Sequence, residues 1–354
     1  MKAADGLWAT LVSWENLMFA AKKSRRRKRN KQETVRFQFA LESNLSALQS
    51  ELENGTYKPG AFRTHWVFRP KKRLISAAPY RDRVVHHALM NILEPILERH
   101  FHPYSFACRK GKGTHAAADT LQQHMRSNPF AMKCDIVKFF PSIDHAILKQ
   151  KFRKLIADVR VLHLMDMIVD NSNEQEEIVH YFEGDDLFAP LARKRGLPIG
   201  NLTSQWFANW YLSGLDHFLA KKIGLPHFVR YCDDFIIAAK TKRELRRSAP
   251  AIETFLASIR LKWHVKKLKV SPVTAGVRFA GFRVFVTHRL ILKENIRSFR
   301  RRLRWLKRAY TCGNINLPEL KARLTSWLGH ARQAHSERLI RRVSKDWTFV
   351  RGGA

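Results

Sequence analysis

Two adjacent carboxylates, Asp233 and Asp234, stand between two short apolar segments. Residues 228–231 (FVRY) lead in and residues 235–239 (FIIAA) lead out, so the pattern predicts a β-hairpin with both acids at its tip. Like charges held together at the end of a buried sheet repel each other unless a divalent cation neutralises them. Aspartate is also common in solvated turns, so this motif alone leaves both interpretations open.

A third acid, Asp135, lies within an apolar strand pattern, residues 130–137 (FAMKCDIV). A lone carboxylate is costly to bury, although alternation along a strand permits a surface-facing side chain. The competing interpretation places Asp135 beside the predicted Asp233–Asp234 hairpin, at neighbouring strand ends. Three carboxylates there would hold two Mg²⁺ ions about 3.5–4 Å apart for in-line phosphoryl transfer, one activating a hydroxyl and the other stabilising the leaving group.

The charge balance indicates a polyanionic partner. The chain has 354 residues, with 65 Lys and Arg against 30 Asp and Glu, a formal net charge of +35. A field of this size favours nucleic acid, while composition alone also fits a membrane-surface or ribosome-associated protein. The four cysteines form no C-x-x-C pair, which argues against a zinc site and a disulfide framework and favours a reducing compartment.

Chain length and hydropathy limit the class of protein further. A chain of this length accommodates two or three subdomains and a sizeable core. No apolar run approaches the roughly 20 residues of a membrane span, and the first residues lack the apolar core of a signal peptide. We therefore expect a cytoplasmic protein with no membrane association.

Hydrophobic periodicity predicts a mixed α and β chain. Helical patterns cover residues 7–21, 35–53, 82–100, 201–222, 241–260, 293–308 and 317–334. Strand patterns cover a hairpin at 63–78, then 130–137, the Asp233–Asp234 hairpin, and 277–286. We expect Asp82 to cap its helix, and Cys134 and Cys232 to lie inside strands as small buried hydrophobes. The basic run 22–31 is expected to form a loop that faces nucleic acid.

The acidic motifs resemble those of reverse transcriptases. Residues 231–235 (YCDDF) are similar to the family's Tyr-x-Asp-Asp box, and residues 134–144 (CDIVKFFPSID) to its first palm motif. Four further blocks follow the family's order: 69–89 (RPKKRLISAAPYRDRVVHHAL), 105–117 (SFACRKGKGTHAA), 195–212 (RGLPIGNLTSQWFANWYL) and 277–284 (VRFAGFRV). The resemblance covers roughly residues 7 to 340. One block is weakly specific, whereas six in order are strongly specific.

The resemblance implies an α/β (α+β) right-hand polymerase that makes DNA on an RNA template from dNTPs with two Mg²⁺ ions. An N-terminal extension and fingers would occupy residues 1–127. An antiparallel-sheet palm would occupy 128–288, with a fingers-proximal insertion at about 171–196. A short helical thumb would occupy 289–354. Partners would be template RNA and the RNA/cDNA duplex.

The block at residues 195–212 narrows the choice among reverse transcriptase subfamilies. Most reverse transcriptases, including group II intron enzymes, have Gln before the glycine of the 195–212 block and Ser-Pro at its end. Here Ile199 and Ser204-Gln205 stand instead. These residues, with 13–29 (SWENLMFAAKKSRRRKR) and 326–335 (SWLGHARQAH), are similar to the reverse transcriptases of diversity-generating retroelements.

That subfamily, encoded by bacteria and phages, misincorporates opposite template adenines, and the mutated cDNA replaces a variable repeat in a target gene. It works with a small basic oligomeric accessory protein, for which the acidic stretch 174–186 is a candidate contact. A group II intron maturase is one alternative, although the predicted thumb ends close to Ala354, so we expect no added DNA-binding or endonuclease domain. A defence-type reverse transcriptase and a non-catalytic RNA-binding scaffold are the others.

Site roles transfer by the resemblance to matching positions. Asp135, Asp233 and Asp234 would bind the metal ions as catalytic carboxylates, and the Ile136 carbonyl would complete a metal shell. For the substrate, we expect contacts from residues that match family positions around the incoming nucleotide: Arg73 and Lys71 on the triphosphate, Phe140 under the sugar, Ile199, Gln205, and Lys267 with Lys266 and Lys269 as alternatives.

Ile199 replaces a Gln that touches the incoming nucleotide, and the loss of a polar contact is expected to reduce discrimination between right and wrong pairs. A neutral apolar replacement is the alternative. The turn 279–282 matches the primer-grip hairpin, where Gly281 permits close backbone approach. Arg300, Arg301 and Arg304 lie on the cationic helix 293–308 and are expected to bind duplex phosphates, with strong salt dependence.

Overall fold

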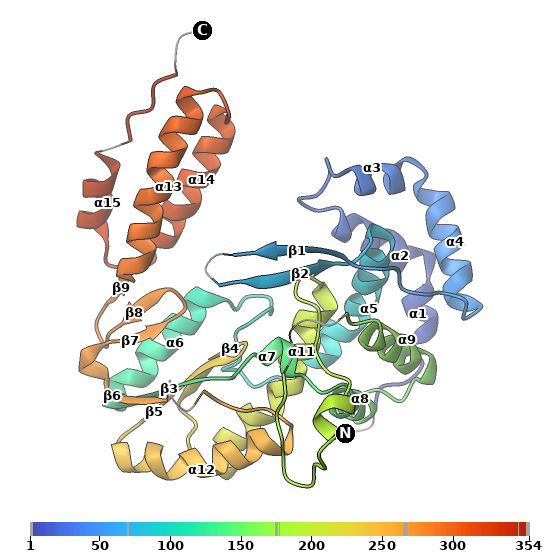
Figure 1. Cartoon of the computed structure of the whole chain (residues 1–354), viewed down its shortest axis with the longest axis horizontal. Coiled ribbons are helices and arrows are strands. Elements are labelled where there is room, and N and C mark those ends of the chain that lie inside the picture. Colours follow the sequence, from blue (N-terminus) through green and yellow to red (C-terminus); the bar gives the residue numbers. More distant parts are fainter. Residues whose placement is uncertain are drawn as a thin grey trace.

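A four-stranded antiparallel sheet lies at the centre of the fold, with strand order β4-β5-β3-β6 (Figure 1). Its strands are β3 (Phe130–Asp135), β4 (Phe228–Tyr231), β5 (Asp234–Ala239) and β6 (Lys269–Pro272). The structure is a computed structural model that describes residues 3–68, 71–173, 176, 178–264, 268–345 and 347–351. Strand β4 runs into β5 through a tight turn, as the apolar segments on either side of the acidic pair predict.

The two faces of this sheet belong to different cores. Met132 and Cys134 of β3 pack on the side covered by α12 (Lys242–Ser258), in the larger core. Ala131 packs on the other side with α6 (Thr114–Ser127). Because side chains alternate along a strand, Lys133 and Asp135 share the face of Ala131.

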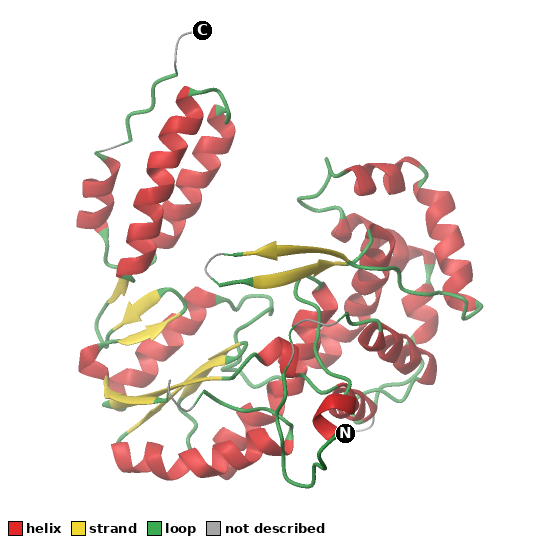
Figure 2. Cartoon of the chain, in the orientation of Figure 1, coloured by secondary structure: helices red, strands yellow, loops and turns green. Residues whose placement is uncertain are grey.

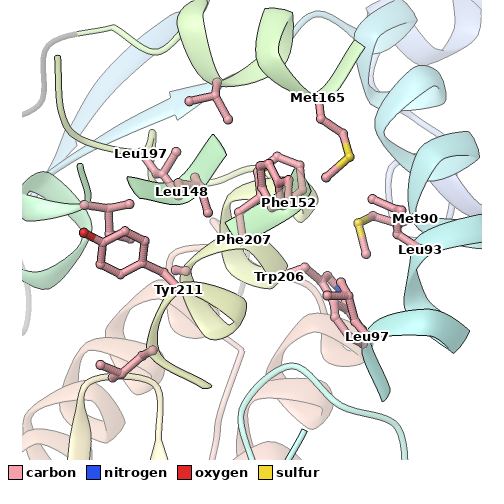
Figure 3. Packing of buried hydrophobic residues seen from close by; sticks show 14 of the residues in the cluster. Met90, Leu93, Leu97, Leu148, Phe152, Met165, Leu197, Trp206, Phe207 and Tyr211 are labelled. Carbon is pink, nitrogen blue, oxygen red and sulfur yellow. The ribbon is translucent and has the colours of Figure 1, made fainter. Parts of the chain in front are cut away.

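Helices pack around the sheet (Figure 2). The larger core is built mainly by α5 (Tyr80–Glu98), α8 (His145–Arg153), α9 (Val159–Asp170) and α11 (Leu202–His217). Their buried side chains interdigitate around Phe152 and Phe207, whose ring centroids are 4.7 Å apart (Figure 3). The remaining elements here are α1 (Trp8–Val12), α2 (Trp14–Ser24), α3 (Gln32–Phe39), α4 (Leu41–Glu53), α7 (Phe139–Ser142), α10 (Ala189–Ala192) and η1 (Phe218–Lys222).

The predicted hairpin at 63–78 is confirmed as β1 (Arg63–Val67) paired with β2 (Arg73–Ala77). All five residues of β1 are exposed. In Figure 1 this hairpin extends over the central sheet toward the C-terminal helices.

The C-terminal part begins with a small antiparallel sheet against α6. It contains the short helix η3 (Val273–Ala275) and the strands β7 (Val277–Phe279), β8 (Phe282–Val284) and β9 (Arg289–Ile291). Three helices follow and stand apart from the rest in Figure 1: α13 (Lys293–Thr311), α14 (Leu317–Ala331) and α15 (Glu337–Ser344). No helix in the described part of the chain is long and apolar enough to cross a membrane.

Several local predictions were wrong in detail. The patterns at 7–21 and 35–53 each contain two helices, because the chain leaves helical geometry at Ser13 and Ala40. Pro79, not Asp82, is the N-cap residue of α5. Asp82 is buried in the first turn, where it accepts hydrogen bonds from the Tyr57 hydroxyl and the Gly60 N–H. The 277–286 pattern is two strands around a turn, the helix predicted to reach 334 ends at Ala331, and α15 was not predicted.

Candidate active site

The three carboxylates meet at one edge of the central sheet. Asp135 is the last residue of β3, and its Cα partner in the antiparallel ladder is Asp234, the first residue of β5. Asp233 lies in the turn that precedes Asp234. Directly paired residues of antiparallel strands project from the same face, so Asp135 and Asp234 project together. The expected meeting of the two acidic segments is therefore present.

Burial and mutual repulsion raise the pKa of two of these groups. The pKa of Asp234 rises to about 6, mainly because of burial, with contributions from Asp233 and Asp135 and an opposing one from Lys133. The pKa of Asp233 is raised by burial and by Asp135, against the opposing charges of Arg73 and Lys71. The charge repulsion among these carboxylates is the part of each shift that a bound cation would relieve.

The donor set suits Mg²⁺, which prefers carboxylate and carbonyl oxygens. Asp234 Oδ1 is buried and has no hydrogen-bond partner among the described residues. This oxygen would therefore be able to bind a metal ion. Among the described residues, no group of three or more His, Cys, Asp or Glu side chains is arranged to hold a metal ion. Asp234 Oδ2 instead accepts a hydrogen bond from Lys133 Nζ at 2.9 Å. Ile136 is buried next to Asp135, and its carbonyl role stays a prediction.

A buried ion pair beneath the acidic turn was missed by the sequence analysis. Arg230 and Asp216 both have fully buried side chains, and the guanidinium donates two hydrogen bonds of 2.6 Å to the carboxylate. Arg230 Nη1 also donates to the carbonyl of Cys232 at 3.1 Å. The signal was available, because each charge interrupts an apolar pattern and so requires a buried partner.

This contact holds a left-handed turn residue. Cys232 has φ 55°, a region that non-glycine residues adopt only when the surroundings enforce it. The expectation that Cys232 lies inside a strand is therefore wrong, because it forms the turn itself, whereas Cys134 is buried in β3 as expected. The guanidinium of Arg230 thus fixes the backbone that presents Asp233.

The β1–β2 hairpin brings positive charge to the acids. Arg73 begins β2 and Lys71 precedes it, and both lower the pKa of Asp233 through their charge. A guanidinium can grip phosphate oxygens in bidentate fashion, which a lysine cannot. Both predicted triphosphate contacts are therefore near enough to Asp233 for their charges to act on it, and their role stays a prediction.

The segment around Ile199 is hydrogen-bonded to β2 at three points. The carbonyl of Ile199 accepts from the Ser76 N–H at 2.8 Å. The buried side chain of Asn201 accepts from the Ala78 N–H at 3.1 Å and donates to the Ser76 carbonyl at 3.0 Å. Gly200 has φ +127°, and a Cβ there would approach the Ile75 side chain to 3.1 Å. Asn201 was not predicted, yet it ties Ile199 to the strand that carries Arg73.

Two further predicted substrate contacts lie on either side of this segment. Phe140 is half-buried in α7, and its carbonyl accepts a hydrogen bond from the Leu197 N–H at 3.0 Å. Its neighbour Phe139 is buried in the larger core, as expected. Gln205 is exposed in the first turn of α11 and accepts a hydrogen bond from Cys108 Sγ at 3.4 Å.

Comparison with known protein families identifies the family of this chain. Residues 58–284 match the family described as reverse transcriptase (RNA-dependent DNA polymerase). The chain belongs to this family. The matched range contains all three carboxylates, the β1–β2 hairpin and the Ile199 segment.

Individual relatives are distant. The chain is 24% identical to Protein YkfC of Escherichia coli (strain K12) over 298 residues, which is 73% of this chain and 74% of YkfC. It is 25% identical to Group II intron-encoded protein LtrA of Lactococcus lactis subsp. cremoris over 181 residues, 50% of this chain and 28% of LtrA. Among solved structures, telomerase from Candida albicans in complex with a telomeric RNA fragment is 13% identical with a TM-score of 0.48, over 81% of this chain and 54% of that one.

In this reverse transcriptase the β7–β8 turn lies against the C-terminal helices. Gly281 has φ +89°, and a Cβ there would meet the His330 ring at 3.2 Å. The Gly281 carbonyl accepts a hydrogen bond from the Asn295 side chain at 3.1 Å. The close neighbour of Gly281 in the structure is helix α14, and the primer contact of this turn stays a prediction.

The predicted duplex contacts lie on α13. Arg300, Arg301 and Arg304, here called the thumb arginines, are all exposed, while the opposite face of α13 buries Phe299 and Leu303. Lys267 and Lys266 fall outside the described residues. The alternative Lys269 is exposed in β6, with Lys133 as its Cα partner on β3.

Proposed function

We propose that this chain copies a template RNA into cDNA from dNTPs and introduces errors at template adenines during diversity-generating retrohoming. The observation that carries the polymerase reaction is the pairing of Asp135 with Asp234 beside Asp233, in a chain of net charge +35. We further propose the division into fingers (1–127), palm (128–288) and thumb (289–354). The basic chain would attract the template and duplex through their phosphates.

In this proposal Asp135, Asp233, Asp234 and the Ile136 carbonyl would hold two Mg²⁺ ions. When bound, the ions would supply a lowered pKa for the primer 3′-hydroxyl and charge neutralisation at the leaving pyrophosphate. The protein's own contribution is to keep these oxygens at one sheet edge before the substrate arrives. Asp135 raises the pKa of Asp233 and of Asp234 through charge repulsion, and a bound cation would relieve that repulsion.

Arg73 and Lys71 would hold the triphosphate of the incoming dNTP. Their position opposite Asp233 supports this role, since a triphosphate bound between them and the metal site would have charge partners on both sides. The Phe140 ring would lie under the sugar and exclude a 2′-hydroxyl. Gln205 and one lysine of the 266–269 region would complete the nucleotide contacts.

Ile199 would account for the errors. Its backbone is fixed by the hydrogen bond to Ser76, so its side chain occupies a defined place and offers no polar group. A site that recognises a base pair partly by hydrogen bonds loses discrimination when one of them is removed. Asn201 supports the proposal, because it keeps Ile199 at a constant position relative to Arg73.

The proposed accessory partner is a small basic oligomeric protein that contacts the acidic stretch 174–186. Among the described residues of this region, Glu183 and Asp186 are exposed, and the neighbouring Leu187, Phe188 and Leu191 are 69%, 69% and 63% exposed. Acidic and apolar groups together suit a protein surface better than a nucleic acid. We place the system in the cytoplasm of a bacterium, encoded by the host or a phage.

Sequencing of cDNA tests the proposal directly. Purified protein, Mg²⁺, dNTPs and an RNA template of balanced composition should yield cDNA with errors concentrated at template adenines. Ile199→Gln should reduce those errors, whereas the control Leu191→Gln, at an exposed site, should not. Asp135→Asn should abolish synthesis; activity that survives this change would refute the proposed metal site.

Faithful cDNA from the unmodified chain would refute the diversity-generating role and support an intron-type or defence-type enzyme. The intron-type role is the second candidate, because LtrA is named as a group II intron-encoded protein. Template RNA binding without any cDNA, and unchanged by Asp135→Asn, would instead indicate a non-catalytic scaffold. A basic accessory protein would have to be added before that conclusion is drawn.

A further inference from the structure

Lys133 connects two parts of the site that lie far apart in the sequence. Its Nζ donates to Asp234 Oδ2 at 2.9 Å, across 101 residues. The same Nζ donates to the backbone carbonyl of Arg278 at 2.9 Å, across 145 residues. Asp234 begins β5 next to the acidic turn, and Arg278 is the middle residue of β7. One ammonium group thus bridges the turn and the β7–β8 hairpin.

The strand register explains why this residue reaches both partners. Lys133 precedes Asp135 by two residues on β3, so both side chains project from one face. Asp234 is the cross-strand partner of Asp135, which makes it the diagonal neighbour of Lys133. The small sheet of β7–β9 packs on this same face with α6. The Lys133 side chain lies between the two sheets and is 32% exposed, so its charge keeps contact with water.

The geometry of Lys133 fits a residue that links two segments better than a residue that only neutralises the charge of Asp234. A counter-ion requires only the carboxylate, whereas Lys133 also uses a backbone carbonyl that carries no net charge. Two acceptors on different segments define the direction of the ammonium group, and hydrogen bonds to charged groups are the stronger class. Asp234 is held through Oδ2 alone, and its buried Oδ1 remains without a partner among the described residues.

We propose that Lys133 is a positioning residue that sets the separation between the carboxylate turn and the β7–β8 hairpin, and with it the placement of a primer end against the carboxylates. The inference rests on the roles proposed above for the acids and for this hairpin. Lys133 itself touches neither the substrate nor the reacting atoms. Its effect comes from holding Asp234 and the Arg278 backbone at a constant distance, because small displacements of reacting groups lower rates strongly.

The first test is amide hydrogen exchange in the metal-free protein, which does not depend on catalysis. Lys133→Met keeps the length of the side chain and removes the charge. Exchange should become at least about tenfold faster in residues 232–235 and 277–284 together, since both lose a shared hydrogen-bonded anchor. Lys240→Met is the matched control, because Lys240 is an exposed lysine at the far end of β5. It should leave both segments unchanged.

The second test is single-turnover primer extension. Lys133→Met should lower the extension rate at least about tenfold with little change in the dNTP concentration needed for half-maximal rate, since placement rather than nucleotide binding is altered. Lys133→Arg should retain most of the rate and exchange protection. In a double-mutant cycle, Lys133→Met and Asp234→Asn should be non-additive, because the lysine acts through Asp234.

Wild-type exchange in both segments of Lys133→Met would overturn the proposal, even if the rate fell, because a counter-ion role would then suffice. Faster exchange in the turn alone would also overturn it, since the hairpin would not be linked. If Lys133→Met does not fold, the amide exchange of Lys133→Arg is compared with that of Lys240→Met. An arginine can maintain both hydrogen bonds, so faster exchange of residues 277–284 in Lys133→Arg would refute the bridge. Activity that survives Asp135→Asn would refute the proposed metal site. It would not affect the test of Lys133, because amide exchange in the metal-free protein does not depend on catalysis.

Discussion

The ion pair between Arg230 and Asp216 gives the sharpest test of how the site is supported. Asp216→Asn keeps the shape of the side chain and removes its charge, which leaves a fully buried guanidinium without its bidentate anion. The guanidinium retains hydrogen bonds to Asn209, Ser105 and the Cys232 carbonyl, so the network is weakened and not deleted. Both stability and catalysis should respond.

The expected magnitude follows from burial. Breaking a fully buried pair by removing one partner costs about 3–5 kcal/mol, because the remaining charge stays desolvated. Folded proteins are stable by only about 5–15 kcal/mol, so the loss is a large share of the total. The turn adds a catalytic effect, because the left-handed Cys232 is held by Arg230 and such conformations cost about 1–3 kcal/mol. A relaxed turn would move Asp233 from its place, and extension should slow at least about tenfold.

Urea unfolding followed by tryptophan fluorescence measures the stability change, taken as the midpoint shift multiplied by a common slope. Asp166→Asn is the matched control, since Asp166 is also a helical aspartate paired with an arginine, but its partner Arg153 is 48% exposed. An exposed pair contributes about 0–1 kcal/mol. A loss below about 1 kcal/mol for Asp216→Asn, equal to that of the control, would refute the reasoning from burial.

The remaining predictions concern the Asn201 segment, the turn at Gly281, the carboxylates and helix α13. Asn201→Ala should lower the free energy of unfolding in urea by roughly 2–4 kcal/mol and raise the KM for dNTPs, because the Ala78 N–H and the Ser76 carbonyl lose their partners. An unchanged KM would show that this segment takes no part in nucleotide binding. Gly281→Ala should cost about 1–3 kcal/mol in thermal unfolding because of its positive φ and the His330 ring, and native stability would contradict that. The pKa of Asp234 is raised to about 6, so the folded state binds this proton more tightly than the unfolded chain. Metal-free protein should therefore lose stability relative to Asp234→Asn as pH rises from about 4 to about 6, and Mg²⁺ should flatten the difference; melting curves with a constant difference would oppose this. Glutamine at all three thumb arginines should make the salt dependence of duplex binding shallower, by roughly one unit of slope for each phosphate that the variant no longer binds, while an unchanged slope would place the duplex elsewhere.

Local sequence patterns were sufficient to predict the class of protein and to single out the three carboxylates. Asp135 and the Asp233–Asp234 pair stand out because carboxylates are costly inside apolar strands, and their meeting followed from two strand ends that needed a common cation. The positive charge of the chain and the order of its motifs depend on composition and spacing alone. Elements with strong periodicity, such as α5, α11 and α12, were therefore predicted to within a few residues.

Local errors had local causes that periodicity does not record. Ser13 and Ala40 break patterns that remain apolar on both sides of the break. Asp82 resembles a cap in sequence, yet hydrogen bonds from Tyr57 and Gly60 draw it into the interior. For Asp82 the tertiary partners, not the residue's own propensity, decide its place.

The sequence determined which residues carry charge into the site and the large net positive charge of the chain. The tertiary structure alone decided how those charges are held: Arg230 against Asp216, Lys133 between Asp234 and Arg278, and Asn201 against β2. Each of these interactions joins residues that are distant in sequence or face each other across different elements. The physical reason is that a charge inside an apolar pattern indicates that it needs a partner, but only the packed chain determines which partner comes within hydrogen-bond distance.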